Sequence, residues 1–322
     1  MDPMTSVSPL VTLPGTDLSV HRLNLGGNPF GWGADKDTSY AVLDAYVAAG
    51  GNFVDTADMY TCWVPGCVGG ESETIIGQWM KDRGNRDSMV IATKVGMLDG
   101  KDNLDPANIR ACVEDSLTRL QTDYIDLYYA HQDDPNADQL AVAQTFDALV
   151  QEGKVRHLAA SNFTLERLTS ARRIQQENGL ATYAVIQNRY NLLAREDYSL
   201  ALEEYIRAEG MGELPFASLA AGFLTGKHLD EGGAEGSART GVVAKFLEDP
   251  TAVKAVELLR AIAAAHGTSP TAVALAWQLS HDTIPSTIAS ARVAEQVPDL
   301  MAGAALELTA DEVAALTAVA PR

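Results

Sequence analysis

The sequence predicts an α/β protein, a (β/α)8 TIM barrel in which eight parallel strands alternate with helices. Short apolar runs alternate with segments of helical periodicity along the whole chain, as expected for parallel strands joined by crossover helices. Eight such units fit into 322 residues, and 46% of the residues are hydrophobic, enough to bury a large core. We see no linker or low-complexity segment, so we expect one domain over residues 1–322.

The expected strands are short and mostly apolar, and each is bounded by turn or capping residues. In chain order they are Arg22–Leu25, Asn52–Asp55, Met89–Lys94, Tyr124–Ala130, Val155–Ser161, Ala184–Gln187, Glu213–Leu219 and Thr283–Ser286.

Helix signals lie between these strands. Tyr40, Leu43 and Val47 share one helix face, and Gly50 and Gly51 end that helix.

Two helix starts repeat one pattern, a capping residue followed by proline. Asp105 with Pro106, and Ser269 with Pro270, each place an N-cap residue before a proline at the first helical position. We therefore expect helices to begin at both places.

The ends of the chain add to the barrel. The segment Leu10–Val20 carries Pro14 and Gly15 between short apolar runs, which predicts an N-terminal β-hairpin at the barrel bottom. Residues 300–322 lie beyond the eight units, and we expect extra C-terminal helices there. The connections Thr61–Gly70 and His228–Thr240 are long enough to form loops over the barrel mouth.

Composition excludes several classes of partner. The formal net charge of −19 disfavours nucleic acid and anionic membrane surfaces, which would repel this chain. No apolar run reaches the ~18 residues of a spanning helix, and no signal peptide precedes the domain, so we expect a cytoplasmic protein. Cys62, Cys67 and Cys112 are expected to be free thiols, and no metal site is predicted.

Four polar residues lie at or near the ends of successive expected strands, where a barrel of this kind builds its chemistry. They are Asp55, Tyr60, Lys94 and His131. A tyrosine holds its proton at neutral pH, because its ordinary pKa is near ~10. We expect the ammonium of Lys94 to lower the pKa of Tyr60, Asp55 to hold Lys94, and the histidine to orient a carbonyl oxygen.

These residues and their order resemble the aldo-keto reductase family, and the resemblance covers nearly the whole chain. The matching motifs include GGNFVDTADMY, IQNRYN, PFASLAAGFLTGK and ASARVAEQ, in family order. The resemblance implies an oxidoreductase that moves a hydride between NADP(H) and a small carbonyl or alcohol substrate. By the same resemblance Tyr60 is the general acid and base, Lys94 and Asp55 tune it, and His131 positions the carbonyl.

The resemblance also implies a cofactor site. Ser161, Asn162 and Gln187 match the residues that bind the nicotinamide carboxamide, and Phe216 matches the ring that stacks on the nicotinamide. The pyrophosphate would lie along residues 217–222. Arg292 would hold the adenosine 2′-phosphate, which favours NADP(H) while leaving NAD(H) possible. The full expected set is Gly27, Asn28, Asp55, Ser161, Asn162, Gln187, Phe216, Ala217, Ser218, Leu219, Ala220, Gly222, Lys227, Arg239, Ser290, Arg292, Gln296 and Leu300.

The chain departs from the family pattern at several of these positions. Phe216 and Ala217 replace a common Tyr-Ser pair, and Ser218 stands where proline is common. Gln296 replaces a basic residue, and Leu300 replaces the usual adenine-side asparagine. A further departure is Glu213, a glutamate at a strand position that is usually apolar.

Some signals have two interpretations. Trp32 and Trp63 are either substrate-pocket walls or partly buried anchors. Glu71 and Glu73 are ordinary acidic residues of a first helical turn, or, with Asp55, the carboxylates of a barrel glycosidase. In the family that the chain resembles, the same barrel also serves as a cofactor-binding regulatory subunit with little turnover, and this is the alternative function. The natural substrate, the direction of reaction and the oligomeric state stay open.

Overall fold

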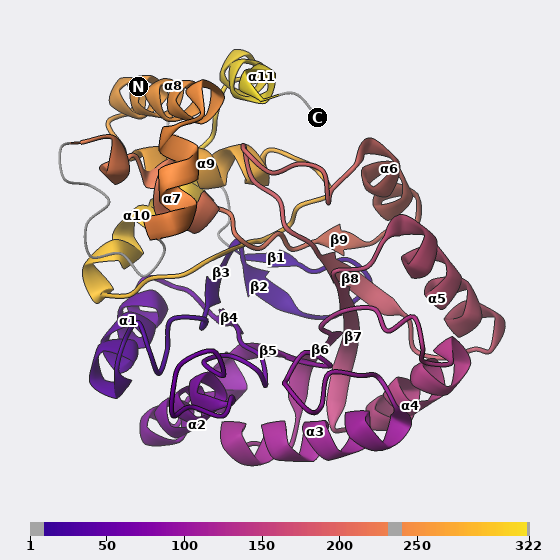
Figure 1. The fold of residues 1–322 in the computed structure, drawn as a ribbon. Coiled ribbons are helices and arrows are strands. Elements are labelled where there is room, and N and C mark those ends of the chain that lie inside the picture. Colours follow the sequence, from indigo (N-terminus) through magenta and orange to yellow (C-terminus); the bar gives the residue numbers. More distant parts are fainter. Residues whose placement is uncertain (1–9, 231–239, 321–322) are drawn as a thin grey trace.

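The computed structural model describes residues 10–230 and 240–320 and consists of one eight-stranded parallel sheet that curls into a barrel (Figure 1). The sheet order is β10-β3-β4-β5-β6-β7-β8-β9. Its two edges are joined by hydrogen bonds from Glu213 N to Thr283 O (2.8 Å) and from Ile288 N to Pro215 O (3.0 Å). The strands are β3 (Leu23–Gly26), β4 (Phe53–Asp55), β5 (Val90–Val95), β6 (Ile125–Ala130), β7 (Val155–Ser161), β8 (Tyr183–Gln187), β9 (Gly212–Glu213) and β10 (Thr287–Ala289). The predicted (β/α)8 fold is confirmed.

Helices surround this sheet, and each covers the outer face of neighbouring strands (Figure 1). The ring consists of α1 (Lys36–Ala48), α2 (Glu71–Arg83), α3 (Pro106–Leu120), α4 (Gln139–Gln151), α5 (Leu165–Glu177), α6 (Leu200–Ala208), α9 (Pro270–Leu279) and α10 (Val297–Ala305). Outside the ring lie α7 (Thr240–Leu247), α8 (Pro250–His266) and α11 (Ala310–Val319), at the upper left of Figure 1. Extra helices near the C-terminus are thus present.

The two expected helix starts are at the predicted residues, with one difference. Ser269 precedes α9, and its side chain accepts a hydrogen bond from Ala272 N. Asp105 precedes α3 in the N-cap position, but its side chain makes no capping hydrogen bond. Pro106 supplies the start of α3 instead, because its ring already holds a helical φ.

Two of the expected strands differ from the observed ones. The seventh was expected over Glu213–Leu219, but regular pairing ends at Glu213 because Pro215 follows closely and the backbone then turns. The eighth was expected over Thr283–Ser286 and instead occupies Thr287–Ala289. Pro285 has no N–H to donate, so pairing with the β3 side begins after it, at Thr287 N to Arg22 O (3.0 Å).

The N-terminal hairpin closes the bottom of the barrel, as predicted. Strands β1 (Leu10–Thr12) and β2 (Ser19–His21) pair antiparallel. Leu13, Leu18 and Val20 are buried in the same apolar cluster as inward-facing strand residues such as Phe53 and Leu127. These side chains fill the end of the barrel opposite to its mouth.

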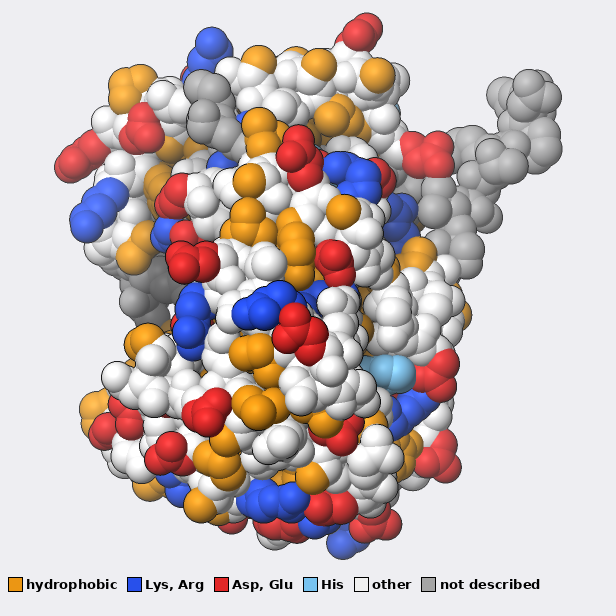
Figure 2. Space-filling view, turned by 90° about the vertical axis from the view of Figure 1, so that its right-hand side faces the viewer, with side chains coloured by type: hydrophobic (Ala, Val, Ile, Leu, Met, Phe, Trp, Pro, Cys, Tyr) orange, Lys and Arg blue, Asp and Glu red, His pale blue; other side chains and the backbone are white. Residues whose placement is uncertain are grey.

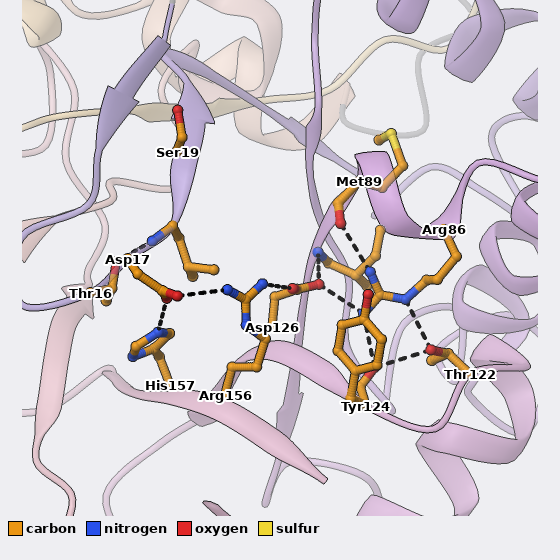
Figure 3. Close-up of polar contacts among 12 residues, drawn as sticks. Thr16, Asp17, Ser19, Arg86, Met89, Thr122, Tyr124, Asp126, Arg156 and His157 are labelled. Atoms are coloured by element: carbon orange, nitrogen blue, oxygen red, sulfur yellow. Dashed lines mark hydrogen bonds and ion pairs between the residues drawn. The ribbon is translucent and has the colours of Figure 1, made fainter. Parts of the chain in front are cut away.

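A network of charged residues ties this hairpin to the barrel (Figure 3). Its centre is Asp126 on β6, which is 1% exposed. One carboxylate oxygen accepts from Ile91 N (2.9 Å) and pairs with Arg86 (2.8 Å), and the other pairs with Arg156 (2.8 Å). Arg156 also pairs with Asp17 of the hairpin turn at 3.0 Å. The hairpin is therefore held by charge as well as by apolar packing.

Cys62, Cys67 and Cys112 are free thiols, as expected. Within residues 10–230 and 240–320, no helix combines the length and the apolar character that crossing a bilayer requires.

Candidate active site

A cavity of about 960 Å³ opens at the carboxyl ends of the strands. Its wall comes from the segments after β3 and β9, the beginning of α9, and the chain from β10 into α10. Asp55 and Tyr60 lie on the lining at one end, and Arg292 lies on the lining after β10. The cavity therefore reaches the residues of two distant sequence motifs.

Three of the four expected catalytic side chains meet at the end of β4 and β5. Asp55 is the last residue of β4, Lys94 is on β5, and Tyr60 is in the turn that follows β4. The Lys94 ammonium donates to Asp55 Oδ2 (2.6 Å), to Tyr60 Oη (3.0 Å) and to Thr56 O (2.6 Å). The Tyr60 hydroxyl donates to Asp55 Oδ2 at 3.2 Å. A phenol, an ammonium and a carboxylate are thus in mutual contact.

Burial controls the acidity of this group. Burial raises the pKa of Tyr60 well above its usual value, and the charge of Asp55 raises that pKa further. Burial also lowers the pKa of Lys94, while Asp55 opposes that shift. The net shift in the pKa of Tyr60 is therefore upward, opposite to the direction expected from the charge of Lys94 alone. The reason is that Asp55, in contact with both groups, offsets the lysine charge, and the cost of desolvating a phenolate dominates.

His131 completes the group from β6. It follows the last residue of that strand, is 7% exposed, and its ring centroid lies 6.2 Å from that of Tyr60. Burial, with the nearby charge of Lys94, holds the pKa of His131 well below its usual value. The imidazole is therefore expected to be neutral at pH 7, with one ring nitrogen carrying a proton and the other an acceptor.

The expected carboxamide-binding residues form a hydrogen-bonded set next to this group. Gln187 Nε2 donates to Asp55 Oδ1 at 3.0 Å. Ser161 Oγ donates to Gln187 O (2.8 Å), and Asn162 Nδ2 donates to Ser161 Oγ (3.1 Å) and to His131 O (2.9 Å). Asn162 has a φ of +56°, a left-handed conformation that asparagine tolerates better than most residues. The ends of β7 and β8 are thereby joined by hydrogen bonds to Asp55 and to the backbone of His131.

The chain after β9 forms a tight backbone turn along the cavity. Left-handed φ values occur at Ala217, Ala220, Ala221 and Gly222. Of the expected residues here, those on the lining are Phe216, Ala217, Ser218, Leu219, Gly222 and Lys227. Ala220 is 4% exposed and is not on the lining, and the Ser218 hydroxyl donates to Ile288 O at 2.7 Å. Ser218 therefore ties this turn to β10.

At the α10 end, the lining includes Ser290, Arg292, Gln296 and Leu300 as expected. Gln296 Oε1 accepts from Arg292 N at 2.8 Å, so the glutamine amide nitrogen keeps its donors for other partners. Arg239 lies outside the described residues.

Other expected residues lie close to the cavity in different ways. Asn28 and Trp32 line it, whereas Gly27 lies behind it, where its N–H donates to Asp55 O (2.7 Å). Trp63 is 42% exposed and packs edge-on against Trp32 (5.9 Å between centroids) and Tyr60 (6.3 Å). Trp32 therefore lines the cavity as expected, whereas Trp63 is not on the lining and packs against both Trp32 and Tyr60.

Several lining residues were not anticipated. They are Gly26, Pro29, Gly33, Thr225, Val242, Ser269, Thr271, Ile288 and Ala289. The Ser269–Pro270 helix start was a usable signal for two of them, because a helix N-terminus that follows a barrel loop commonly faces a ligand. Val242 carries no such signal in the sequence.

The carboxylates of the glycosidase alternative do not face the cavity. Glu73 is fully buried, pairs with Arg119 (2.6 Å) and accepts from Thr93 Oγ1 (2.6 Å). Glu71 is in the first turn of α2, where Oε1 accepts from Val68 N (2.9 Å). Neither side chain is on the cavity lining, which leaves Asp55 without either of them as a second carboxylate across it.

Comparisons with known proteins agree with this arrangement. The family model of the Aldo/keto reductase family matches residues 22–321. The Escherichia coli protein named Protein tas is 32% identical over 334 residues, covering 95% of this chain and 96% of that protein. Aldo-keto reductase ausK of Aspergillus calidoustus is 33% identical, covering 95% and 80% of the two chains. Norsolorinic acid reductase B of Dothistroma septosporum is 30% identical, covering 96% and 80%.

Proposed function

Because this chain belongs to the Aldo/keto reductase family, we propose that it is an NADP(H)-dependent oxidoreductase acting on the carbonyl or alcohol carbon of a small substrate. Family membership establishes oxidoreduction of small molecules as the reaction class. The observation that carries the finer proposal is the mutual contact of Tyr60, Lys94 and Asp55 at the end of the cavity.

The cavity suits a dinucleotide. Its volume of about 960 Å³ is at the upper end of small-molecule sites. A Cβ on Gly26 would lie 2.5 Å from Ser290 Oγ, so a larger residue would crowd the part of the cavity lining that Gly26 and Ser290 form. The turn over residues 217–222 has several left-handed φ values, a backbone geometry that also occurs in anion-binding nests. Lys227 and Arg292 add positive charge, and these features favour NADP(H), with NAD(H) as an alternative.

When bound, the nicotinamide supplies or accepts the hydride. The residues of this chain handle the proton and the geometry. Tyr60 holds a proton on Oη and gives it to the carbonyl oxygen as negative charge develops there. Lys94 stabilises the resulting phenolate, and Asp55 holds Lys94 in place. The neutral ring of His131 donates to the same oxygen, and Trp32 and Trp63 limit access of water.

The role of the phenol is tested with Tyr60→Phe, which removes the proton and keeps the ring. We expect NADPH-dependent reduction of a generic aldehyde such as a nitrobenzaldehyde to fall by ~10²-fold or more. Affinity for NADPH, followed by its fluorescence, should change little. Wild-type turnover in this variant would show that another group donates the proton, and absence of NADPH binding by the wild-type protein would overturn the proposed cofactor.

A further inference from the structure

Glu213 is a carboxyl group in a place where a charge is costly. It ends β9, is 0% exposed, and forms no ion pair among the residues that the structure describes. Its side chain bonds to a backbone group: Oε1 accepts from Asn188 N at 2.8 Å. Burying a carboxyl without a cation costs stability. The hydrogen bond from Asn188 N offsets part of this cost.

In the pairing of β8 with β9, the Glu213 side chain takes the place of a missing backbone acceptor. Regular pairing covers only Val185 with Gly212 and Ile186 with Glu213, followed by a bond from Leu214 N to Ile186 O (2.9 Å). The next donor along the β8 side is Asn188 N, and the Glu213 side chain accepts its hydrogen bond in place of a backbone carbonyl. Backbone pairing then resumes from Phe216 N to Asn188 O at 3.0 Å.

Two residues of the proposed cofactor site are directly connected to Asn188. Gln187 directly precedes Asn188, and its amide donates to Asp55 Oδ1 at 3.0 Å. Phe216 lines the cavity and is joined to Asn188 by the resumed ladder. We propose that Glu213 is a positioning residue, which holds Asn188 so that Gln187 and Phe216 keep the spacing that the nicotinamide requires. This inference rests on the function proposed above.

The chemistry of the contact suggests the variants. Burial raises the pKa of Glu213 well above its usual value. A glutamine keeps the same length and the same accepting oxygen, whereas methionine keeps the length and removes the acceptor. Glu213→Gln and Glu213→Met therefore separate hydrogen bonding from packing. Glu204, exposed on α6, provides the matched control Glu204→Met.

The experiment measures NADPH affinity by fluorescence, thermal stability, and hydrogen exchange of the peptide over residues 187–191. For Glu213→Met we expect roughly tenfold weaker NADPH binding, since one buried hydrogen bond is lost, and faster exchange at Asn188. Its Tm should stay within a few degrees of wild type, because a poorly compensated carboxyl is also removed. Glu213→Gln and Glu204→Met should bind NADPH within about threefold of wild type.

Four outcomes would overturn the inference. Wild-type affinity and wild-type exchange in Glu213→Met would make Glu213 a simple core residue. An equal loss in Glu213→Gln would mean that the accepting oxygen is not what matters. If Glu213→Met does not fold, NADPH affinity and hydrogen exchange are measured on Glu213→Leu instead. Faster exchange of residues 187–191 in Glu213→Gln than in wild type would also contradict the inference. No NADPH binding by the wild-type protein would remove the proposed function and this inference together.

Discussion

Buried carboxyl groups in this molecule differ because their partners differ. Asp55 faces the Lys94 ammonium at 2.6 Å, and Glu73 faces the Arg119 guanidinium at 2.6 Å. Asp58 has no such ion pair among the described residues, and both of its carboxylate oxygens are buried without a hydrogen-bond partner there. Burial, and then the charge of Glu73, raise the pKa of Asp58 from 3.8 to about 7. The pKa of a carboxyl two residues before Tyr60 is therefore shifted toward neutral pH.

Asp58 should make stability depend on pH. Its folded-state pKa lies above its unfolded value, so between about pH 4 and pH 7 the folded state binds more protons and stability falls as pH rises. The loss of unfolding free energy across this window is at most about 4 kcal/mol. We expect Asp58→Asn to be more stable, relative to wild type, at pH 8 than at pH 5. Urea unfolding at both pH values measures this, with exposed Asp102→Asn as control. An equal difference at the two pH values would contradict it.

The raised pKa of Tyr60 predicts which reaction direction responds to pH. A phenol that stays protonated can act as an acid throughout the neutral range, whereas its conjugate base is scarce. We expect the rate of carbonyl reduction to be flat from about pH 6 to pH 9, and alcohol oxidation to rise with pH over that range. The rates are compared where a deuteride isotope effect shows that hydride transfer limits turnover. A loss of reduction above pH 7 would indicate a lowered pKa instead.

At the scale of elements, the proposed catalytic group depends on how neighbouring strands end. Asp55 and Lys94 come from adjacent strands β4 and β5, and Gln187 comes from β8 across the barrel mouth. The opposite end is closed by the β1–β2 hairpin and the charged network around Asp126 (Figure 3). Chemistry and stability are therefore concentrated at opposite ends of the same strands.

The network at the bottom should be a major source of stability. Asp126→Ala leaves Arg86 and Arg156 without their buried partner and Ile91 N without an acceptor. Loss of one partner of a buried pair costs about 3–5 kcal/mol. Asp17→Ala removes an exposed partner of Arg156 and His157, so its cost should be below about 1 kcal/mol. Chemical denaturation of both variants checks this, and similar losses would show that Asp126 is not the centre of the network. Turnover of folded Asp126→Ala should be close to wild type.

At the scale of the whole molecule, the net charge of −19 coexists with a cavity that carries Lys227 and Arg292. Figure 2 shows acidic and basic side chains interspersed on the face that carries α5 and α6, with no large patch of one sign. The overall charge favours solubility and repels polyanions. Binding of an anionic cofactor then depends on the local basic groups of the cavity.

Cofactor binding should stabilise the entire barrel, because the cavity joins segments from β3 to α10. At NADPH concentrations of 100 times Kd, we expect about 2.7 kcal/mol of added stability and a Tm that keeps rising with concentration. NADH at the same concentration should raise the Tm less, because it lacks the phosphate that would face Arg292. Differential scanning fluorimetry measures both. A larger effect of NADH would reverse the proposed cofactor preference.

Local patterns were sufficient for most of the fold. Ser269 before Pro270 predicted the start of α9, and apolar runs predicted six of the strands to within a few residues. The errors occurred at prolines. Pro215 shortened β9, and Pro285 displaced β10 to Thr287–Ala289, because a residue without an N–H changes where a ladder can begin.

The sequence by itself determined the barrel and the identity of the residues at its strand ends, since side-chain period and chain order are local properties. Tertiary structure alone decided the acidity of Tyr60, the contact of Gln187 with Asp55, and the presence of Val242 on the cavity wall. Desolvation and contacts between residues far apart in the chain set these properties, and neither is encoded in any short stretch of residues.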